Sequence, residues 1–276
     1  QPNRHRMTET TPTASAPWGD HPIPERGQVV RPDFGPLALW LRRVQNELWL
    51  AWKRTDEGLI PEGTELPPDV DWRRWALEDR PHRVRLLPAL PDRMLVVKTE
   101  QPFTLLRKAE ARVFTRIGAW VRVEAVDEEK GTAARLTEIP TEIHSDTWWG
   151  DFADGEIAYW LSTKARREVS DSLFKPHLIM AVLHLTNRSA DDLPVEKLAL
   201  RVEHLSIYEI EGRLWAEETR VDYQGEDLGS DIRMDDKPPR EAGEAREITP
   251  ARAQTRGFRA RTFARLRALS SFGSGG

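Results

Sequence analysis

Cysteine is absent from the 276 residues of this chain. The protein therefore has no disulfide framework, no thiolate metal ligand and no cysteine nucleophile, which excludes small disulfide-rich secreted domains and cysteine-based zinc modules. Long apolar runs are also absent. None approaches the length of a membrane-spanning helix, and none follows Arg4 and Arg6 as it would in a secretory signal. From these absences we expect a cytoplasmic protein without a transmembrane segment.

Local signatures of the common enzyme classes are missing as well. The sequence has no Gly-x-Ser-x-Gly elbow, no phosphate-binding Gly-Lys-Ser/Thr loop, no dinucleotide fingerprint and no His-Glu-x-x-His pair. We therefore predict no catalytic residues, no cofactor and no metal. One alternative stays open, because metal ligands from distant strands leave no local spacing. A metal-dependent hydrolase would use His144 with Asp146 and Asp151.

The chain has no strong excess of either charge. Its 41 Lys and Arg residues against 45 Asp and Glu residues give a net charge of −4, which argues against a general attraction to nucleic acid. We expect no specific nucleic-acid partner. Trp72 and Trp75 enclose Arg73 and Arg74, an arrangement that can stack on bases and contact phosphate. A Trp pair at this spacing is more typical of a packing anchor on one helical turn, and we favour that interpretation.

Tryptophan is abundant, with eleven residues in the chain, and aromatic side chains concentrate in residues 146–160. Asp154 and Gly155 form the strongest hairpin signal of this stretch, because Gly takes a positive φ angle at no steric cost. We predict two aromatic strands that fold back on each other at this turn.

The same stretch supports a second functional hypothesis. Exposed aromatic rings can stack on sugars while neighbouring carboxylates accept hydrogen bonds from sugar hydroxyl groups. A carbohydrate-binding or carbohydrate-active β-sandwich would use Trp148, Trp149, Asp151, Tyr159 and Trp160. Tyr159 and Trp160 are adjacent in the predicted strand, so they face opposite sides and at least one of them is expected to be buried.

Short apolar segments separated by proline and glycine continue through residues 32–223. Segments of this length with such punctuation are typical of strands in an all-β, antiparallel β-sandwich, and not of alternating strands and helices. One sandwich fits this pattern, and so do two stacked β-subdomains divided near Gly131.

Residues 37–53 are compatible with two structures. Apolar residues from Trp40 to Trp52 recur at helical spacing, but those on either side of Gln45 and Asn46 also alternate as in two strands. We favour the hairpin, because the rest of the chain has β character.

The two ends of the chain have little apolar periodicity. Residues 1–31 are rich in Thr and Pro, and we expect a disordered arm. Residues 224–250 are acidic and contain Gly and Pro, and we expect a linker. Residues 251–276 form an Arg-rich amphipathic tail, in which cationic and apolar side chains alternate: Arg252, Arg256, Phe258, Arg259, Arg261, Phe263, Arg265 and Arg267.

A cationic tail with an apolar side can bind a groove in a partner or lie on an anionic membrane. Our leading hypothesis is a non-enzymatic binding or accessory module that residues 251–276 tether to a protein partner or an anionic membrane surface. Deleting the tail is expected to abolish this association and to leave thermal unfolding nearly unchanged.

The order of four segments resembles a known family. The segments are residues 85–97, residues 119–123, residues 139–143, and Trp149-Gly150 followed by Asp154-Gly155. Over roughly residues 34–223 the chain is similar to the prokaryotic domain-of-unknown-function family 432. It departs from the family pattern in its Trp-Trp-Gly, where Tyr-Gly is usual, and in its Arg-rich tail. The resemblance implies a β-rich accessory domain without assigned catalytic residues. It also implies association with small mechanosensitive channel proteins, which would give the cationic tail a place to act.

Overall fold

The computed structural model of the protein describes residues 18–24, 28–57, 60, 66–78, 82–151, 153, 155–226 and 228–264. Within these ranges the helical segments are four short 3-10 turns, η1 (Thr55–Glu57), η2 (Asp171–Leu173), η3 (Val202–His204) and η4 (Arg240–Ala242). The regular structure is otherwise β-strand, so the all-β prediction is confirmed. No helix in the described ranges is long and apolar enough to cross a membrane.

Two sheets form a first sandwich. One sheet has the order β1 (Gly19–Pro22), β7 (His82–Ala89), β10 (Trp120–Asp127) and β11 (Ala133–Pro140). The other has the order β2 (Val29–Val30), β4 (Leu37–Val44), β5 (Glu47–Arg54) and β6 (Arg73–Ala76), with β3 (Asp33–Phe34) paired to β4. Leucines of β4 and β5 pack against valines of β7 and β10 between the two sheets.

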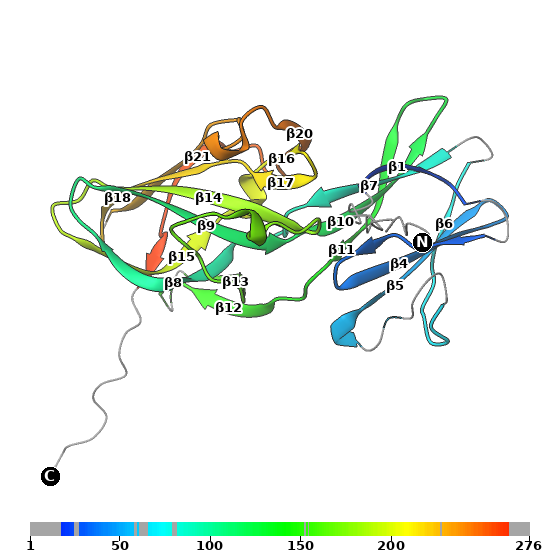
Figure 1. Ribbon diagram of the computed structural model, residues 1–276, viewed down its shortest axis with the longest axis horizontal. Helices are drawn as coiled ribbons and strands as arrows, with labels where there is room; N and C mark the ends of the chain where they lie inside the picture. Colours follow the sequence, from blue (N-terminus) through cyan, green and yellow to red (C-terminus); the bar gives the residue numbers. More distant parts are fainter. Residues whose placement is uncertain are drawn as a thin grey trace, which may run out of the picture.

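Two further sheets form a second sandwich beside the first (Figure 1). The smaller sheet has the order β12 (Ser145–Trp149), β13 (Glu156–Trp160), β8 (Leu95–Leu105), β15 (Leu193–Leu200) and β22 (Phe263–Ala264). The larger sheet has the order β20 (Arg246–Thr249), β16 (Ile207–Ile210), β17 (Arg213–Ala216), β14 (Leu178–Asn187), β18 (Thr219–Gly225), β19 (Gly229–Met234) and β21 (Gly257–Ala260), and β9 (Glu110–Gly118) pairs with β14. Most neighbours are antiparallel, but β13 lies parallel to β8, and β14 lies parallel to β17 and β18.

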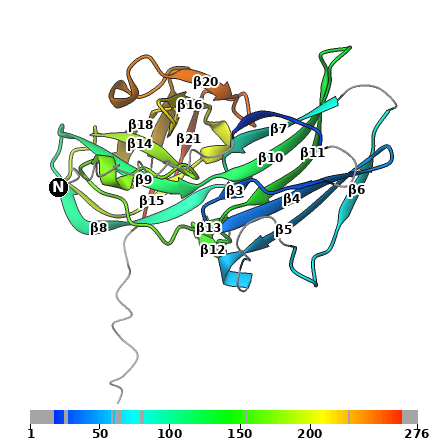
Figure 2. The same cartoon turned by 45° about the vertical axis from the view of Figure 1, so that its right-hand side comes forward.

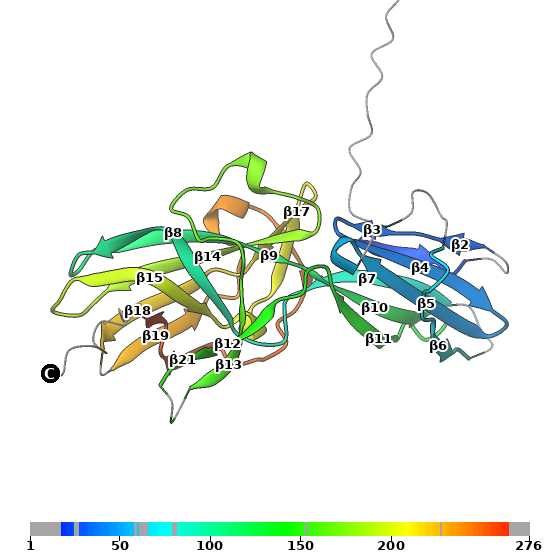
Figure 3. The same ribbon diagram turned by 90° about the horizontal axis from the view of Figure 1, so that it is seen from below.

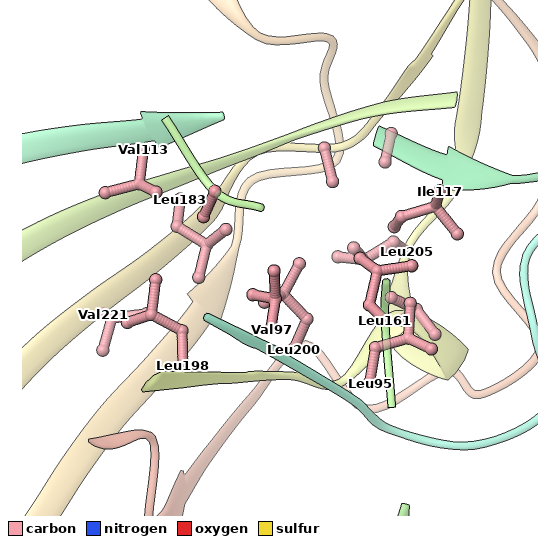
Figure 4. Packing of buried hydrophobic residues seen from close by; sticks show 14 of the residues in the cluster. Leu95, Val97, Val113, Ile117, Leu161, Leu183, Leu198, Leu200, Leu205 and Val221 are labelled. Carbon is pink, nitrogen blue, oxygen red and sulfur yellow. The ribbon is translucent and has the colours of Figure 1, made fainter. Parts of the chain in front are cut away.

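The core of the second sandwich lies between these two sheets. Leu95 and Val97 of β8 point toward side chains of β9, β14 and β18, among them Val113, Leu183 and Val221 (Figure 4). The strand β14 is buried on both faces, as its apolar residues at successive positions require.

The chain crosses between the two sandwiches more than once (Figure 3). Strands β8 and β9 belong to the second sandwich, whereas β7 before them and β10 after them belong to the first. Gly131 lies in the loop between the paired strands β10 and β11, so a division of the chain there is wrong. Contacts join the sandwiches: the Trp18 indole donates a hydrogen bond to the Pro176 carbonyl oxygen at 2.9 Å.

The prediction of a hairpin in residues 37–53 is confirmed. Strands β4 and β5 pair directly, with Leu41 opposite Leu50, and Gln45 in the turn has a φ angle of 52°. Leu39, Leu41 and Leu50 lie in the core of the first sandwich. The packing of one face of this hairpin into the core therefore selects the alternating strand pattern over the helical one.

The described part of the N-terminal arm is not disordered, so that prediction is wrong for it. Residues 1–17 lie outside the described residues. From Gly19 the chain forms β1, which pairs with β7, and Asp20 accepts a hydrogen bond from Arg85 at 2.7 Å. The Trp18 ring packs on Phe34 with 4.4 Å between the ring centroids. A few long-range contacts order a segment that has almost no apolar pattern.

The interpretation of residues 224–250 as a linker is also wrong. This segment contains the end of β18, the whole of β19, the turn η4 and β20. In β19 the buried Ile232 and Met234 alternate with Asp231 and Arg233, which are less buried. The strand therefore has the period of a half-buried strand, but its charged outer face conceals the pattern in the composition.

Candidate functional site

The aromatic stretch forms the predicted hairpin at one edge of the smaller sheet of the second sandwich. Strands β12 and β13 pair in antiparallel fashion, with Trp148 opposite Ile157 and Asp146 opposite Tyr159. Phe152 and Asp154 of the connecting loop lie outside the described residues. Because side chains alternate along a strand, the hairpin places its aromatic residues on two different faces.

Trp149 and Trp160 share the outer face of the sheet. Trp149 is only 4% exposed, packs with Met94 and Val96, and donates an indole hydrogen bond to the Arg261 carbonyl oxygen at 3.0 Å. The ring of Trp160 is partly buried beside this cluster. Trp149 has a structural role in this position, since almost none of its surface is open to a ligand.

Trp148 and Tyr159 lie on the other face. Trp148 is 52% exposed and donates an indole hydrogen bond to the Asp151 carbonyl oxygen. The Tyr159 hydroxyl donates to Asp92 at 3.1 Å, and burial together with this carboxylate raises the pKa of the phenol. The five residues proposed for carbohydrate binding are therefore divided between two faces and do not form one platform.

The loop requires Gly155 for a reason other than the one predicted. Among the glycines of the loop Gly150 has a positive φ angle, 108°, whereas Gly155 has none. A Cβ atom at position 155 would lie 2.3 Å from the Trp148 indole nitrogen and 2.6 Å from the Asp151 carbonyl oxygen. Close approach of the chain to itself, and not backbone conformation, excludes a side chain here.

The three residues considered as metal ligands do not form a site. Asp146 pairs with Arg93 at 3.2 Å, and Asp151 pairs with Arg261 at 2.7 Å. His144 lies against the Tyr159 ring, and burial lowers its pKa. In the part of the chain that the structure describes, no group of three His, Cys, Asp or Glu residues could hold a metal ion.

The described part of the Arg-rich tail is folded onto the protein, so its interpretation as a detached segment is wrong. Four of its arginines form ion pairs with the body of the protein: Arg252 with Glu138, Arg256 with Glu217, Arg259 with Asp231 and Arg261 with Asp151. The two phenylalanines also face inward, Phe258 against His204 and Phe263 against Tyr223. Arg265 and Arg267 lie outside the described residues.

A second cluster of arginine and tryptophan lies on the first sandwich, where the structure brings together residues 42–74. We name it the arginine–tryptophan ladder and define it by Arg42, Trp49, Trp52, Trp72, Arg73 and Arg74. Strands β4, β5 and β6 carry most of it, and Figure 2 shows these strands side by side.

Strand register builds the ladder. Arg42 of β4 lies directly opposite Trp49 of β5, and Trp49 lies directly opposite Arg74 of β6. The guanidinium carbons of Arg42 and Arg74 are 4.4 Å and 3.9 Å from the Trp49 ring centroid. The Trp72 ring, whose centroid is 6.1 Å from that of Trp49, also contacts the Arg42 guanidinium, at 4.1 Å. Guanidinium groups at these distances form cation–π contacts.

Arg73 points to the opposite face of the strand and lies 4.6 Å from the Trp52 ring centroid. Trp75 packs against the core of the first sandwich, as a packing anchor would, but on a strand and not on a helical turn. The motif of Trp72 to Trp75 could therefore be recognised in the sequence. Its partners Arg42 and Trp49 could not, because their positions depend on strand register and not on spacing in the sequence.

The ladder arginines differ electrostatically from those of the tail. Among the described residues no carboxylate lies within ion-pair distance of Arg42, Arg73 or Arg74, and the Nε atom of Arg42 is buried without a hydrogen-bond acceptor. Tryptophan faces hold these cations in place, and no carboxylate among the described residues forms an ion pair with them. Such a surface can accept an anionic group without first breaking an internal ion pair.

Comparison with protein families places these features in context. A family model described as "Protein of unknown function (DUF432)" matches residues 17–267. Comparison with curated proteins gives no match, and comparison with solved structures gives none.

Proposed function

We propose that this chain, which belongs to the DUF432 family of proteins of unknown function, is a non-enzymatic binding module. Its arginine–tryptophan ladder docks an extended acidic segment of a partner protein. The observation that carries the proposal is a set of three arginines, Arg42, Arg73 and Arg74, which tryptophan rings hold without a carboxylate partner in the described residues.

The chemistry of a stacked guanidinium group favours a carboxylate ligand. Stacking on an aromatic ring occupies the faces of the guanidinium and leaves its N–H groups in the plane free to donate. Two parallel N–H donors match the two oxygens of a carboxylate. Arg73 and Arg74 are exposed, so their donors are accessible to a partner.

The charges around the ladder favour a protein segment over a large polyanion. Asp69 and Asp71 are exposed close to Trp72 in the chain, and the protein carries a net charge of −4. A membrane surface or a nucleic acid would meet this negative field over a wide area. A short acidic segment can pair with the arginines alone, and Trp and Arg are the residue types that dominate binding energy in protein interfaces.

The position of β6 favours an extended conformation for that segment. β6 is the last strand of its sheet, and no described strand pairs with its outer edge. An edge strand can accept another strand through backbone hydrogen bonds. A segment added there would place its alternating side chains on the two faces that Arg73 and Arg74 occupy. An acidic segment of a channel protein is one partner of this kind.

Fluorescence anisotropy with a labelled peptide of alternating Glu and Val tests the proposal. We expect saturable binding by the wild-type protein and a loss of about tenfold or more in affinity for the double variant Arg73→Gln, Arg74→Gln. The double variant Arg107→Gln, Lys164→Gln removes the same charge at exposed positions elsewhere, and it should bind as the wild type does.

Equal binding by the ladder variant and the wild type would overturn the proposal. So would binding to anionic vesicles or single-stranded DNA that is tighter than binding to the peptide at the same ionic strength and that the variant Arg73→Gln, Arg74→Gln abolishes. A matched peptide of Lys and Val should bind far more weakly, because its ammonium groups repel the ladder arginines.

A further inference from the structure

A pair of lysines lies on the outer face of the smaller sheet of the second sandwich. Lys98 of β8 and Lys197 of β15 are directly opposite each other in the antiparallel register. Like charges in this relationship repel each other and disfavour the pairing of the strands. The sheet therefore holds two positive charges close together at a position where charge alone would separate them.

The ring of Trp160 keeps the two lysines in place. The ammonium nitrogen of Lys98 is 5.4 Å from the ring centroid and that of Lys197 is 5.7 Å from it. Both distances are within the range of a cation–π contact. The face of the indole thus attracts both cations and offsets part of their mutual repulsion.

Three carboxylates of this sheet and its hairpin loop are paired with arginines. Glu156, which opposes Trp149 in the hairpin, pairs with Arg201. Asp151 pairs with Arg261, and Glu100 pairs with Arg166 at 2.7 Å. In the described part of the chain no carboxylate lies within ion-pair distance of Lys98 or Lys197. Among the described residues the two lysines are therefore a cationic pair with no carboxylate within ion-pair distance.

We propose that Lys98 and Lys197 form an anion-binding clamp above Trp160, and that its ligand is an oxyanion of the phosphate class with two or more negative charges. Each ammonium group offers three N–H donors, and two cations match the charge of a phosphate group. Trp160 packs beside the buried side chains of Met94 and Val96, which support the ring beneath the two cations. The clamp lies in the second sandwich and is independent of the ladder.

Thermal unfolding in inorganic pyrophosphate tests the clamp, because a ligand that binds only the folded state raises Tm by an amount that grows with the logarithm of its concentration relative to Kd. Sodium chloride keeps the ionic strength constant. We expect the Tm of the wild-type protein to rise with the logarithm of the pyrophosphate concentration above Kd, and we expect Lys98→Met and Lys197→Met to need at least tenfold more pyrophosphate for the same rise. Lys164→Met, at an exposed lysine outside the clamp, and the double variant Arg73→Gln, Arg74→Gln should respond as the wild type does.

The conservative variants Lys98→Arg and Lys197→Arg keep the charge and should retain the response, which separates lost binding from lost folding. An equal rise in Tm for the wild type and both methionine variants would overturn the clamp, as would the absence of any rise in Tm up to millimolar pyrophosphate. Vesicles with and without phosphatidic acid distinguish a lipid headgroup from free phosphate. Sedimentation of the wild type, but not of Lys197→Met, with phosphatidic acid vesicles would identify the lipid source.

Discussion

Arg256 donates a hydrogen bond at 2.8 Å to the carboxylate of Glu217, a residue with no exposed surface. The backbone N–H groups of Ser206 and Asp236 also donate to this carboxylate. The contact joins residues that lie 39 positions apart in the sequence. It fastens the beginning of the Arg-rich segment to the larger sheet of the second sandwich.

Loss of this ion pair should destabilise the protein strongly and in a pH-dependent way. We expect Arg256→Gln to lower the free energy of unfolding by about 3 kcal/mol at neutral pH, because it leaves the Glu217 charge buried without its cation. Urea unfolding measures this change. Arg259→Gln is the control, since its partner Asp231 lies at the surface, and it should change stability little.

The pH dependence follows from the pKa of Glu217, which burial raises above its usual 4.5 while Arg256 lowers it. A carboxyl whose pKa is raised by folding stabilises the folded state fully below pH 4.5 and loses this contribution as the pH rises through the folded pKa. Without Arg256 the folded pKa rises further. The loss in Arg256→Gln should therefore be smaller at about pH 5 than at about pH 8. An equal loss at both pH values would contradict this assignment.

Truncation at two positions should show which part of the Arg-rich tail stabilises the fold. A chain that ends at residue 250 loses the contacts of Arg252 with Glu138 and of Arg256 with Glu217, and its Tm should fall by about 10 °C or more. A chain that ends at residue 264 keeps both contacts and should unfold near the wild-type temperature. This outcome differs from the sequence-based expectation that the whole tail can be removed without a change in unfolding. Differential scanning calorimetry measures both chains.

Gly155→Ala should destabilise the aromatic hairpin by about 1 to 3 kcal/mol, since the added methyl group overlaps Trp148 and the Asp151 backbone. Chemical unfolding of Gly155→Ala, Trp148→Ala and the double variant forms a double-mutant cycle. We expect the glycine substitution to cost less when the indole is absent. Strictly additive costs would show that Trp148 is not the obstacle.

His177 should make the protein sensitive to acid. Its side chain is buried against Gly35, and burial lowers its pKa to about 4. A histidine whose pKa is lowered by folding contributes its full stability above the unfolded pKa of 6.5, and this is lost as the pH falls toward 4. The loss is on the order of 3 kcal/mol. In His177→Phe, which keeps a ring in the same space, urea unfolding between these pH values should lack this component.

Residues 37–53 show which structural features a sequence pattern can predict. Alternation of leucines on either side of Gln45 predicted the hairpin, and the structure pairs Leu41 with Leu50 as that pattern requires. The same reasoning located the aromatic hairpin, but it placed the positive φ angle at Gly155 and not at Gly150. Alternation reports which face a side chain occupies, and it carries no information on the path of a loop.

The two proposed binding surfaces could not be predicted from such patterns. Arg42 and Trp49 are seven positions apart and face each other only because β4 and β5 pair in one register, which also brings Arg74 to Trp49. Lys98 and Lys197 are almost a hundred positions apart. Clusters of this kind leave no local spacing in the sequence.

The sequence by itself determined the β character of the chain, because short apolar segments with alternating side chains and frequent Pro and Gly are incompatible with long helices. Only the tertiary structure determined that residues 224–264 fold onto the second sandwich. Their strands bury few apolar side chains, such as Ile232, and depend on ion pairs with distant residues, such as that of Arg256 with Glu217. From the composition alone these charges are expected to be solvated, because only the folded chain brings each arginine next to its carboxylate.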